Sequence, residues 1–432
     1  MKFLITLWLC LVSGLAVAQI GGGPLTIRIT QGVEGALPIA IVPFEWTGQP
    51  LPQDVAQVIT NDLTRSGRFN VMPTADLPAR PSDVAQVNFK DWRTVGMDNL
   101  VIGRITATAD GGYLVEFRLL DVFGGKQLAG FQIPSHVSNL RLTAHHISDI
   151  IFKTLLNIDG AFSTRIAYVT VDRKDAKNSL YRLQIADADG YDAKTILESP
   201  QPLMSPAWSP DGNRLAYVSF EERNSAIYVQ DIRTGAREKV VSGAGINSSP
   251  AFAPDGRRLA VTRSMEGNPD IYIVDIASKQ QRRLTTHEAI DTEAAWAPDG
   301  GTIIFTSDRG GGPQIYRMSP DGGDAKRITF NLGNYNSRAS YSPDGKKLVM
   351  VNGGSGFRIV VLDLATGSSR VLTGSSLDES PSFAPNGSMI IYATMGARGT
   401  ELAAVSVDGT VKQRLALQVG QVREPAWGPF RK

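Results

Sequence analysis

Hydrophobic and polar positions repeat a single unit over the C-terminal two-thirds of the chain. Each unit holds an aromatic residue, then a Pro-Asp-Gly turn or a close variant, and then an apolar run. The aromatic residue recurs every 42 to 45 positions, which matches the length of one four-stranded β-propeller blade. Six copies are present, with the aromatic residue at Trp208, Phe252, Trp296, Tyr341, Phe383 and Trp427.

The turn residues that separate the apolar runs of each unit predict where its strands begin and end. Proline presets φ at the start of the Pro-Asp-Gly turn, aspartate bonds back to the backbone, and glycine takes the left-handed conformation. The motif therefore joins two strands of a hairpin. In the first complete unit, apolar runs at residues 214–218 and 227–231 follow this turn, and a second turn at residues 233–235 leads to a weaker outer strand. Each unit is predicted to be one blade of four strands.

The two ends of the repeat region predict how the ring closes. Residues 165–169 and 180–183 match the second and third strands of a blade, with no innermost strand before them. Residues 424–429 match an innermost strand with nothing after it. Together they make one composite blade, which leaves no open edge at the seam. We expect a six-bladed β-propeller over residues 164–432.

Residues 34–160 lack the repeat and predict a small α/β domain, with helices on one or both faces of a short sheet. Apolar runs and alternating positions indicate the strands, at residues 37–44, 69–71, 100–102, 113–119 and 127–133. Helical spacing indicates a helix that follows Pro52 and ends at Gly67, one at residues 83–95, and one at residues 140–155 that stops at Gly160.

The first 33 residues are predicted to contain a targeting signal followed by an N-terminal arm. Lys2, an apolar stretch at residues 3–15 and a small-residue cleavage site at residues 16–18 are typical of a signal peptide, residues 1–18. In the arm, residues 19–33, the apolar positions Leu25, Ile27 and Ile29 alternate like a strand. Two interpretations are open: a mobile arm that adds to the sheet edge of another protein, or the first strand of the α/β domain.

Composition excludes several classes of function. A net charge of +2 argues against nucleic acid as a partner. The only cysteine, Cys10, lies within the signal peptide, so the mature chain holds no disulfide and no thiolate nucleophile. His145 and His146 are adjacent on a predicted helix and face different directions, unlike a zinc pair. The sequence has no nucleophile elbow and no phosphate loop, and residues 187–190 suit a turn better than a calcium loop. We expect no enzyme activity, no metal and no cofactor.

The segments just before the innermost strands predict a binding surface. In any propeller these segments gather at one end of the channel, here called the rim. The candidate residues that belong to it are Met204, Asn247, Ser249, Asp291, Thr292, Glu293, Asn336, Asp378, Glu379 and Arg423. We expect this mixed, partly acidic rim to bind another protein.

Two other functions compete with protein binding at the channel. A carboxylate pair such as Asp291 and Glu293 suits a hydrolase or lyase, but the sequence supplies no nucleophile, metal or complementary base beside it. A glycan-binding module would expose aromatic rings on the rim, whereas the repeated aromatic residues are expected to be buried in the blades.

The whole chain resembles the TolB family of the Gram-negative Tol–Pal system. The resemblance rests on residues 37–44 of the α/β domain and on the propeller phrases at residues 201–212, 363–367, 377–379 and 420–427. The blade motif alone is generic, and its combination with this N-terminal domain is specific.

The resemblance implies a periplasmic protein–protein adaptor that supports outer-membrane integrity and constriction at cell division. It implies that the propeller binds the lipoprotein Pal, that the arm with Leu25, Ile27 and Ile29 engages TolA, and that some bacteriocins exploit the same propeller face. It also implies a monomer that meets the membrane only through its partners. The family's Pal-binding positions correspond to Met204, Ile246, Ser249, Thr292 and Glu293.

Overall fold

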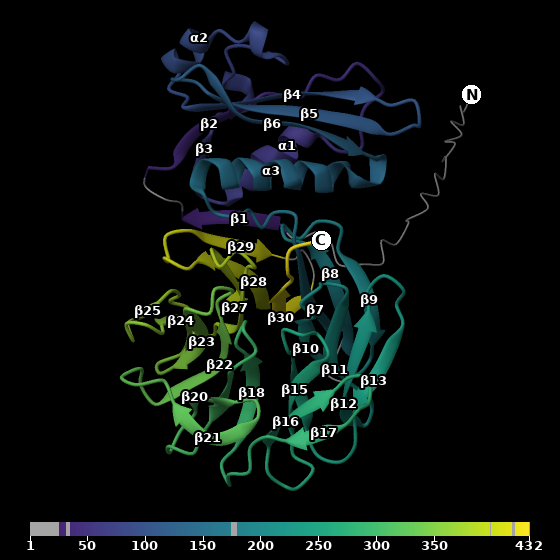
Figure 1. Ribbon diagram of the computed structural model, residues 1–432, viewed down its shortest axis with the longest axis vertical. Helices are drawn as coiled ribbons and strands as arrows, with labels where there is room; N and C mark the ends of the chain where they lie inside the picture. The colour runs from purple at the N-terminus through teal and green to yellow at the C-terminus, as the bar shows by residue number, and fades with distance from the viewer. Residues whose placement is uncertain (1–25, 32–34, 174–178, 398, 417–419, 432) are drawn as a thin grey trace, which may run out of the picture.

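The computed structural model describes residues 26–31, 35–173, 179–397, 399–416 and 420–431. A small α/β domain lies against one side of a ring of β-sheets (Figure 1). No helix among the described residues is long and apolar enough to cross a membrane. The signal peptide and Leu25 lie outside the described residues.

The α/β domain is a five-stranded sheet covered by helices on both faces. The strand order is β3-β2-β4-β5-β6, with bounds β2 Leu37–Ile41, β3 Phe69–Val71, β4 Asn99–Ala107, β5 Tyr113–Asp121 and β6 Lys126–Ser135. The strand β2 runs parallel to β3 and β4, and the other pairs are antiparallel. Helices α1 (Val55–Arg65) and α3 (Leu140–Leu156) share one apolar core with the sheet. A second core on the sheet contains Trp92 of the short helix α2 (Phe89–Thr94).

Local side chains decide where these helices begin and end. The Asp54 carboxylate accepts a hydrogen bond from the Gln57 backbone N–H at 3.0 Å and starts α1 after Pro52. The predicted helix over residues 83–95 is wrong as one element, because the Asn88 side chain caps a new start and divides it into a 3₁₀ turn (η2, Val84–Gln86) and α2. Helix α3 ends before Gly160, since Asn157 takes the left-handed conformation with φ of 55°.

The propeller has six sheets of four strands, and the composite closing blade is confirmed. Its sheet has the order β30-β7-β8-β9, so the last strand of the chain pairs with the first strand of the ring. The six blades have these strands: β10 Leu203–Trp208, β11 Arg214–Glu222, β12 Asn224–Asp231, β13 Arg237–Val241; β14 Asn247–Phe252, β15 Arg258–Arg263, β16 Asp270–Asp275, β17 Gln281–Arg283; β18 Asp291–Trp296, β19 Ile303–Ser307, β20 Gln314–Ser319, β21 Gly322–Arg327; β22 Tyr335–Tyr341, β23 Lys347–Gly353, β24 Phe357–Asp363, β25 Ser369–Val371; β26 Glu379–Phe383, β27 Met389–Gly396, β28 Gly399–Ser406, β29 Lys412–Ala416; β30 Gln421–Trp427, β7 Arg165–Arg173, β8 Ser179–Asp187, β9 Lys194–Ser199.

The Pro-Asp-Gly turns also connect neighbouring blades. Their glycines have φ between 69° and 72°, the left-handed region that side chains with a Cβ avoid. The guanidinium of Arg165 donates to the Gly212 carbonyl at 2.7 Å, and that of Arg214 donates to the Gly256 carbonyl at 2.6 Å. Each of these turns therefore receives a charge-assisted hydrogen bond from the preceding blade.

The strand of the arm, β1 (Thr26–Gln31), belongs to the propeller. It pairs antiparallel with β29, the outermost strand of its blade, and extends that sheet to the order β1-β29-β28-β27-β26. The interpretation of this segment as the first strand of the α/β domain is therefore wrong. The arm does add to a sheet edge, and in this structure the edge is that of its own chain.

The α/β domain packs against two adjacent blades, the β26–β29 blade and the closing blade, at the end of the ring that carries the turns. Arg68 pairs with Asp408 in the β28–β29 turn at 3.0 Å, and the Asn386 side chain in the β26–β27 turn donates to the Asp159 carbonyl at 2.6 Å. Because strands of a blade are antiparallel, these turns lie at the opposite end of the channel from the starts of the innermost strands. The rim is thus left uncovered by the α/β domain.

Candidate functional site

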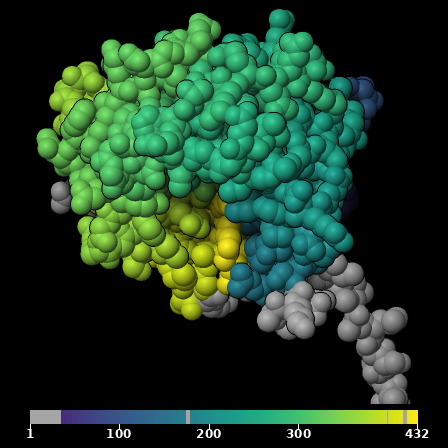
Figure 2. Space-filling model, turned by 90° about the horizontal axis from the view of Figure 1, so that it is seen from below, coloured from purple at the N-terminus to yellow at the C-terminus, as the bar shows by residue number. Residues whose placement is uncertain are grey.

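The rim surrounds a hollow at the uncovered end of the channel. The start of an innermost strand lies beside the end of the second strand, as the pairing of Met204 with Val218 shows. Figure 2 views this side, where the blades follow one another around a hollow from blue-teal through green to yellow. A cavity of about 400 Å³ opens here, and its lining includes Met204, Phe220, Ile246 and Thr292.

The structure places seven of the eleven residues predicted for the rim, with Ile246 included from the family's Pal-binding positions, at or near the surface. Met204 is 40% exposed and Ile246 is 51% exposed, so both present apolar surface to solvent at the mouth of the cavity. The others are half-buried: Ser249, Thr292, Glu293, Glu379 and Arg423.

The remaining four predicted rim residues are completely buried: Asn247, Asp291, Asn336 and Asp378. Each bonds to the second strand of its blade or to the turn that follows it. Asn247 accepts from Arg263 at 2.9 Å, and Asp291 pairs with Arg309 at 2.7 Å. Asn336 accepts from Asn352 at 2.9 Å, and Asp378 accepts from Thr394 at 2.6 Å. Their placement on a contact surface is corrected accordingly: their polar atoms hold the rim loops in place.

Six innermost strands share one backbone irregularity just below the rim. Each has one non-glycine residue with φ between 50° and 56°, at the point where its pairing with the second strand shifts register. Such β-bulges redirect a side chain. The redirected residues are Ser205, Ser249, Glu293, Arg338, Ser380 and Glu424. All of them except Glu424 line a deeper cavity of about 260 Å³ together with their neighbours.

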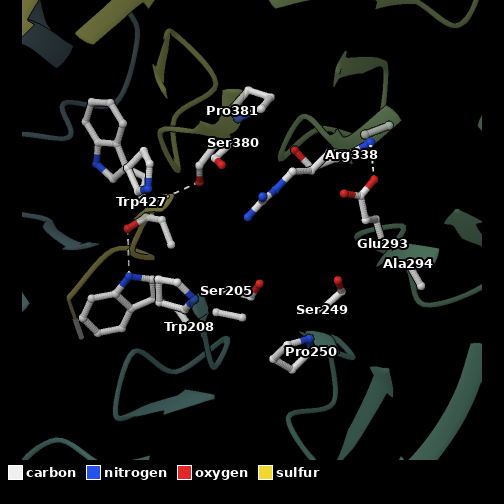
Figure 3. Close-up of a pocket in the computed structure, with 17 residues that line it drawn as sticks. Ser205, Trp208, Ser249, Pro250, Glu293, Ala294, Arg338, Ser380, Pro381 and Trp427 are labelled. Carbon is white, nitrogen blue, oxygen red and sulfur yellow. Dashed lines mark hydrogen bonds between the residues drawn. The ribbon is translucent and has the colours of Figure 1, made fainter. Parts of the chain in front are cut away.

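Arg338 links the charged members of this set. Its guanidinium pairs with Glu424 at 3.1 Å, and its backbone N–H donates to Glu293 at 2.9 Å. Figure 3 shows Arg338 reaching inward from its strand toward the middle of the channel. Burial lowers the pKa of Arg338, but the carboxylates of Glu424, Glu293 and Glu379 outweigh it and raise that pKa overall. The guanidinium therefore stays charged and offsets part of the negative charge of these carboxylates.

The carboxylate pair considered for acid–base catalysis is already engaged. Asp291 is buried against Arg309, and Glu293 accepts hydrogen bonds from the Arg338 backbone and from Thr306, the latter at 3.0 Å. Two carboxylates with such partners act as structural acceptors, and the geometry does not favour the hydrolase or lyase interpretation.

The repeated aromatic residues lie between blades. Phe252, Trp296 and Phe383 are buried, and the other three are partly buried. The indole of Trp208 donates to the Ala426 carbonyl at 3.0 Å, and that of Trp427 donates to Thr164 at 2.9 Å. These rings therefore serve as scaffold, as predicted, and do not form a sugar-stacking platform at the rim.

Comparison with protein families decides the relationship. A model described as the TolB amino-terminal domain matches residues 25–128, and one described as the TolB beta propeller domain matches residues 152–431. The chain belongs to the TolB family. The resemblance stated from the sequence motifs is thereby confirmed, and membership of the TolB family places the chain in the Tol–Pal system.

Individual TolB relatives match over nearly the whole length. The Tol-Pal system protein TolB of Thioalkalivibrio sulfidiphilus is 58% identical over 94% of each chain. That of Xanthomonas oryzae pv. oryzae is 54% identical over 100% of this chain and 98% of its own length. The crystal structure of TolB from Acinetobacter baumannii superposes with a TM-score of 0.87 at 43% identity, covering 94% of this chain and all of that one.

Proposed function

We propose that this chain is a non-enzymatic, periplasmic adaptor of the Tol–Pal system that binds Pal through the rim of its propeller. In this proposal TolA binds the arm, residues 19–33. The adaptor then connects the two proteins in support of outer-membrane integrity and constriction at division, and bacteriocins exploit the same rim.

The observation that carries the proposal is the uncovered cavity of the rim. Apolar anchors in concave, desolvated sites supply most of the free energy in protein–protein interfaces. Met204 and Ile246 present such anchors, and Phe220 and Thr292 line the same cavity. The α/β domain occupies the other end of the ring, so a partner of protein size has access to the rim.

The arm supports the second half of the proposal. The strand β1 is the terminal strand of its sheet, so its outer backbone edge has no strand partner among the described residues. Because β1 lies between α3 and β29, an extended segment of TolA would engage the arm by taking β1 away from β29, and this mode uses main-chain hydrogen bonds.

The test of the rim is calorimetric titration of the mature chain with the soluble periplasmic domain of Pal. We expect saturable one-to-one binding. Ile246→Asp places a charge where the cavity must lose water, and we expect it to weaken Pal binding at least tenfold, about 1.4 kcal/mol. Thr292→Arg fills the cavity mouth and is expected to act in the same direction.

A matched control separates the rim from general damage. Val371 in β25 is 54% exposed, close to the 51% of Ile246, and lies on an outermost strand away from the channel. Val371→Asp should leave Pal affinity unchanged. Wild-type affinity in both Ile246→Asp and Thr292→Arg would remove the rim from the proposal.

A further inference from the structure

A buried histidine stands at the junction of the two domains. His145 of α3 and Asp62 of α1 are each 1% exposed, and the imidazole Nδ1 lies 2.6 Å from the Asp62 carboxylate. The other ring nitrogen, Nε2, faces the propeller, 4.0 Å from the carboxylate of Asp189 in the β8–β9 turn. That Nε2 is buried and has no hydrogen-bond partner. An unsatisfied buried ring nitrogen calls for an explanation.

The bond to Asp62 determines what Nε2 can offer. A carboxylate accepts, so Nδ1 carries the proton of that hydrogen bond. In the neutral imidazole, Nε2 is then a lone pair that faces the Asp189 carboxylate, which is unfavourable. In the imidazolium, Nε2–H faces the same carboxylate as a donor. Gain of one proton therefore converts a repulsive contact between domains into an attractive one.

The surrounding charges come from four elements. Arg65 of α1 pairs with Asp62 at 3.1 Å, and Arg141 of α3 pairs with Asp189. Arg141 also lies 3.8 Å from Asp187 and 3.8 Å above the Tyr191 ring. The groups that face or neighbour His145 are Asp62 and Arg65 from α1, Arg141, His146 and Asp149 from α3, Asp187 and Asp189 from the β8–β9 turn, and Arg431 from the C-terminal segment.

These charges favour a proton over a metal ion at this position. Asp62, His145 and Asp189 have the residue types and spacing of a candidate metal group. However, Nδ1 is already bonded to Asp62, and Asp189 already accepts from Arg141. Only one free nitrogen would remain for a metal, beside the guanidinium groups of Arg65 and Arg141.

We propose that His145 is a pH-dependent latch, which in its protonated form fastens the α/β domain to the closing blade of the propeller through Asp189. This proposal is independent of partner binding at the rim. It makes His145 a positioning residue for the junction, where Arg65 also donates to the Ala188 carbonyl at 3.4 Å. Figure 1 shows that β1 lies between β29 and α3, the helix that carries His145.

The direction of the pH effect follows from the charges. Burial lowers the pKa of His145, but Asp62, and then Asp189, outweigh it and raise that pKa overall. Correspondingly, His145 and Arg65 hold the pKa of Asp62 below its usual value against the effect of burial. A histidine with a raised pKa stabilises the docked state fully below the ordinary value of about 6.5. This stabilisation is lost as the pH rises through the docked pKa.

The test is a pH titration of the full mature chain. The titration is followed by NMR with isotope-labelled histidine rings, so that only the four histidines give signals. The signal that disappears in a His145→Asn variant is that of His145. We expect the His145 midpoint to lie above 6.5. Hydrogen exchange of residues 186–192, expressed as protection relative to the intrinsic rate at each pH, should increase on acidification. Each pH unit by which Asp189 raises the His145 midpoint corresponds to about a tenfold change in the equilibrium constant for docking of the two domains.

Two variants decide the outcome. Asp189→Asn removes the charge that faces Nε2, and His145→Asn keeps an N–H for Asp62 while removing Nε2. Both should make protection of residues 186–192 independent of pH through this range. A midpoint below 6.5, or the same pH dependence in Asp189→Asn, overturns the latch, and the wild-type midpoint decides even where a variant does not fold. Stoichiometric binding of Zn²⁺ that shifts the His145 signal also overturns it in favour of a metal site.

Discussion

Individual residues in turns could be assigned from the sequence, whereas polar residues at strand starts could not. A Pro-Asp-Gly sequence specifies its own backbone locally, so Gly212 and Gly256 have the expected positive φ. Asn247 and Asp291 resemble surface residues by type, and their burial depends on Arg263 in β15 and on Arg309 in the turn after β19. Partners of this kind leave no signal in the local sequence.

Asp363 allows a prediction about acid stability. Its carboxylate accepts from the Thr366 backbone N–H at 3.0 Å and from Lys347 at 3.0 Å, which lowers its pKa to about 2. A lowered pKa stabilises the fold above the unfolded value of about 3.9, and this is lost as the pH falls through about 2. Asp363→Ala should therefore lower the melting temperature at pH 6 and approach wild type near pH 2. Circular dichroism across this range measures it.

An exposed carboxylate elsewhere is the control for that series. Asp324→Ala, on the outermost strand β21, changes the net charge equally and should show a smaller, flatter effect. If the difference in melting temperature between Asp363→Ala and wild type is as large at pH 2 as at pH 6, the stabilising role of the ionised Asp363 carboxylate is contradicted.

At the scale of elements, apolar periodicity predicted the helices whose position depends on local propensity and on the burial of one face. The helix after Pro52 and the closing helix at residues 140–155 were both indicated by their apolar spacing, because one face of each packs on the sheet. The segment at residues 83–95 divides because Asn88 competes as a cap. The partner of β1 could not be predicted, since an alternating strand fits any open sheet edge.

The arm yields a prediction at this scale. Deletion of residues 19–33 should abolish binding of TolA and leave Pal affinity at the rim unchanged, because none of the described residues that line the rim cavity comes from that segment. Pull-down and calorimetry with each soluble partner domain measure the two effects. Replacement of the segment by a Gly/Ser sequence of equal length controls for spacing. TolA binding that survives both changes would contradict a role for the arm.

The whole molecule divides in the same way into a predictable part and an unpredictable part. Five complete repeats and two partial repeats determine the ring and its composite blade, because each unit can bury its apolar faces only against its neighbours. The docking of the α/β domain onto the turn end could not be predicted, because no repeated sequence pattern specifies it. Its contacts join single residues such as Arg68 and Asp408, which are remote in the chain.

Removal of residues 421–432 tests the composite blade. The deletion takes away β30 and leaves the β7 edge and the adjoining core open, so we expect the melting temperature to fall by at least about 10 °C and cooperativity to decrease. Differential scanning calorimetry measures both. The chain without residues 19–33 is the matched control, since β1 adds to a blade that already has four strands. Equal melting temperatures for the two truncated chains would contradict closure by β30.

The composite blade also orders events in time. The indole of Trp427 meets Thr164 across 263 positions of sequence, so nearly every residue must be present before the ring can be completed. A chain that emerges from its N-terminus onward stays an open arc of blades until the final strand arrives. We therefore expect a chain that stops before β30 to keep an unfilled seam, with the β7 edge open to proteases and chaperones.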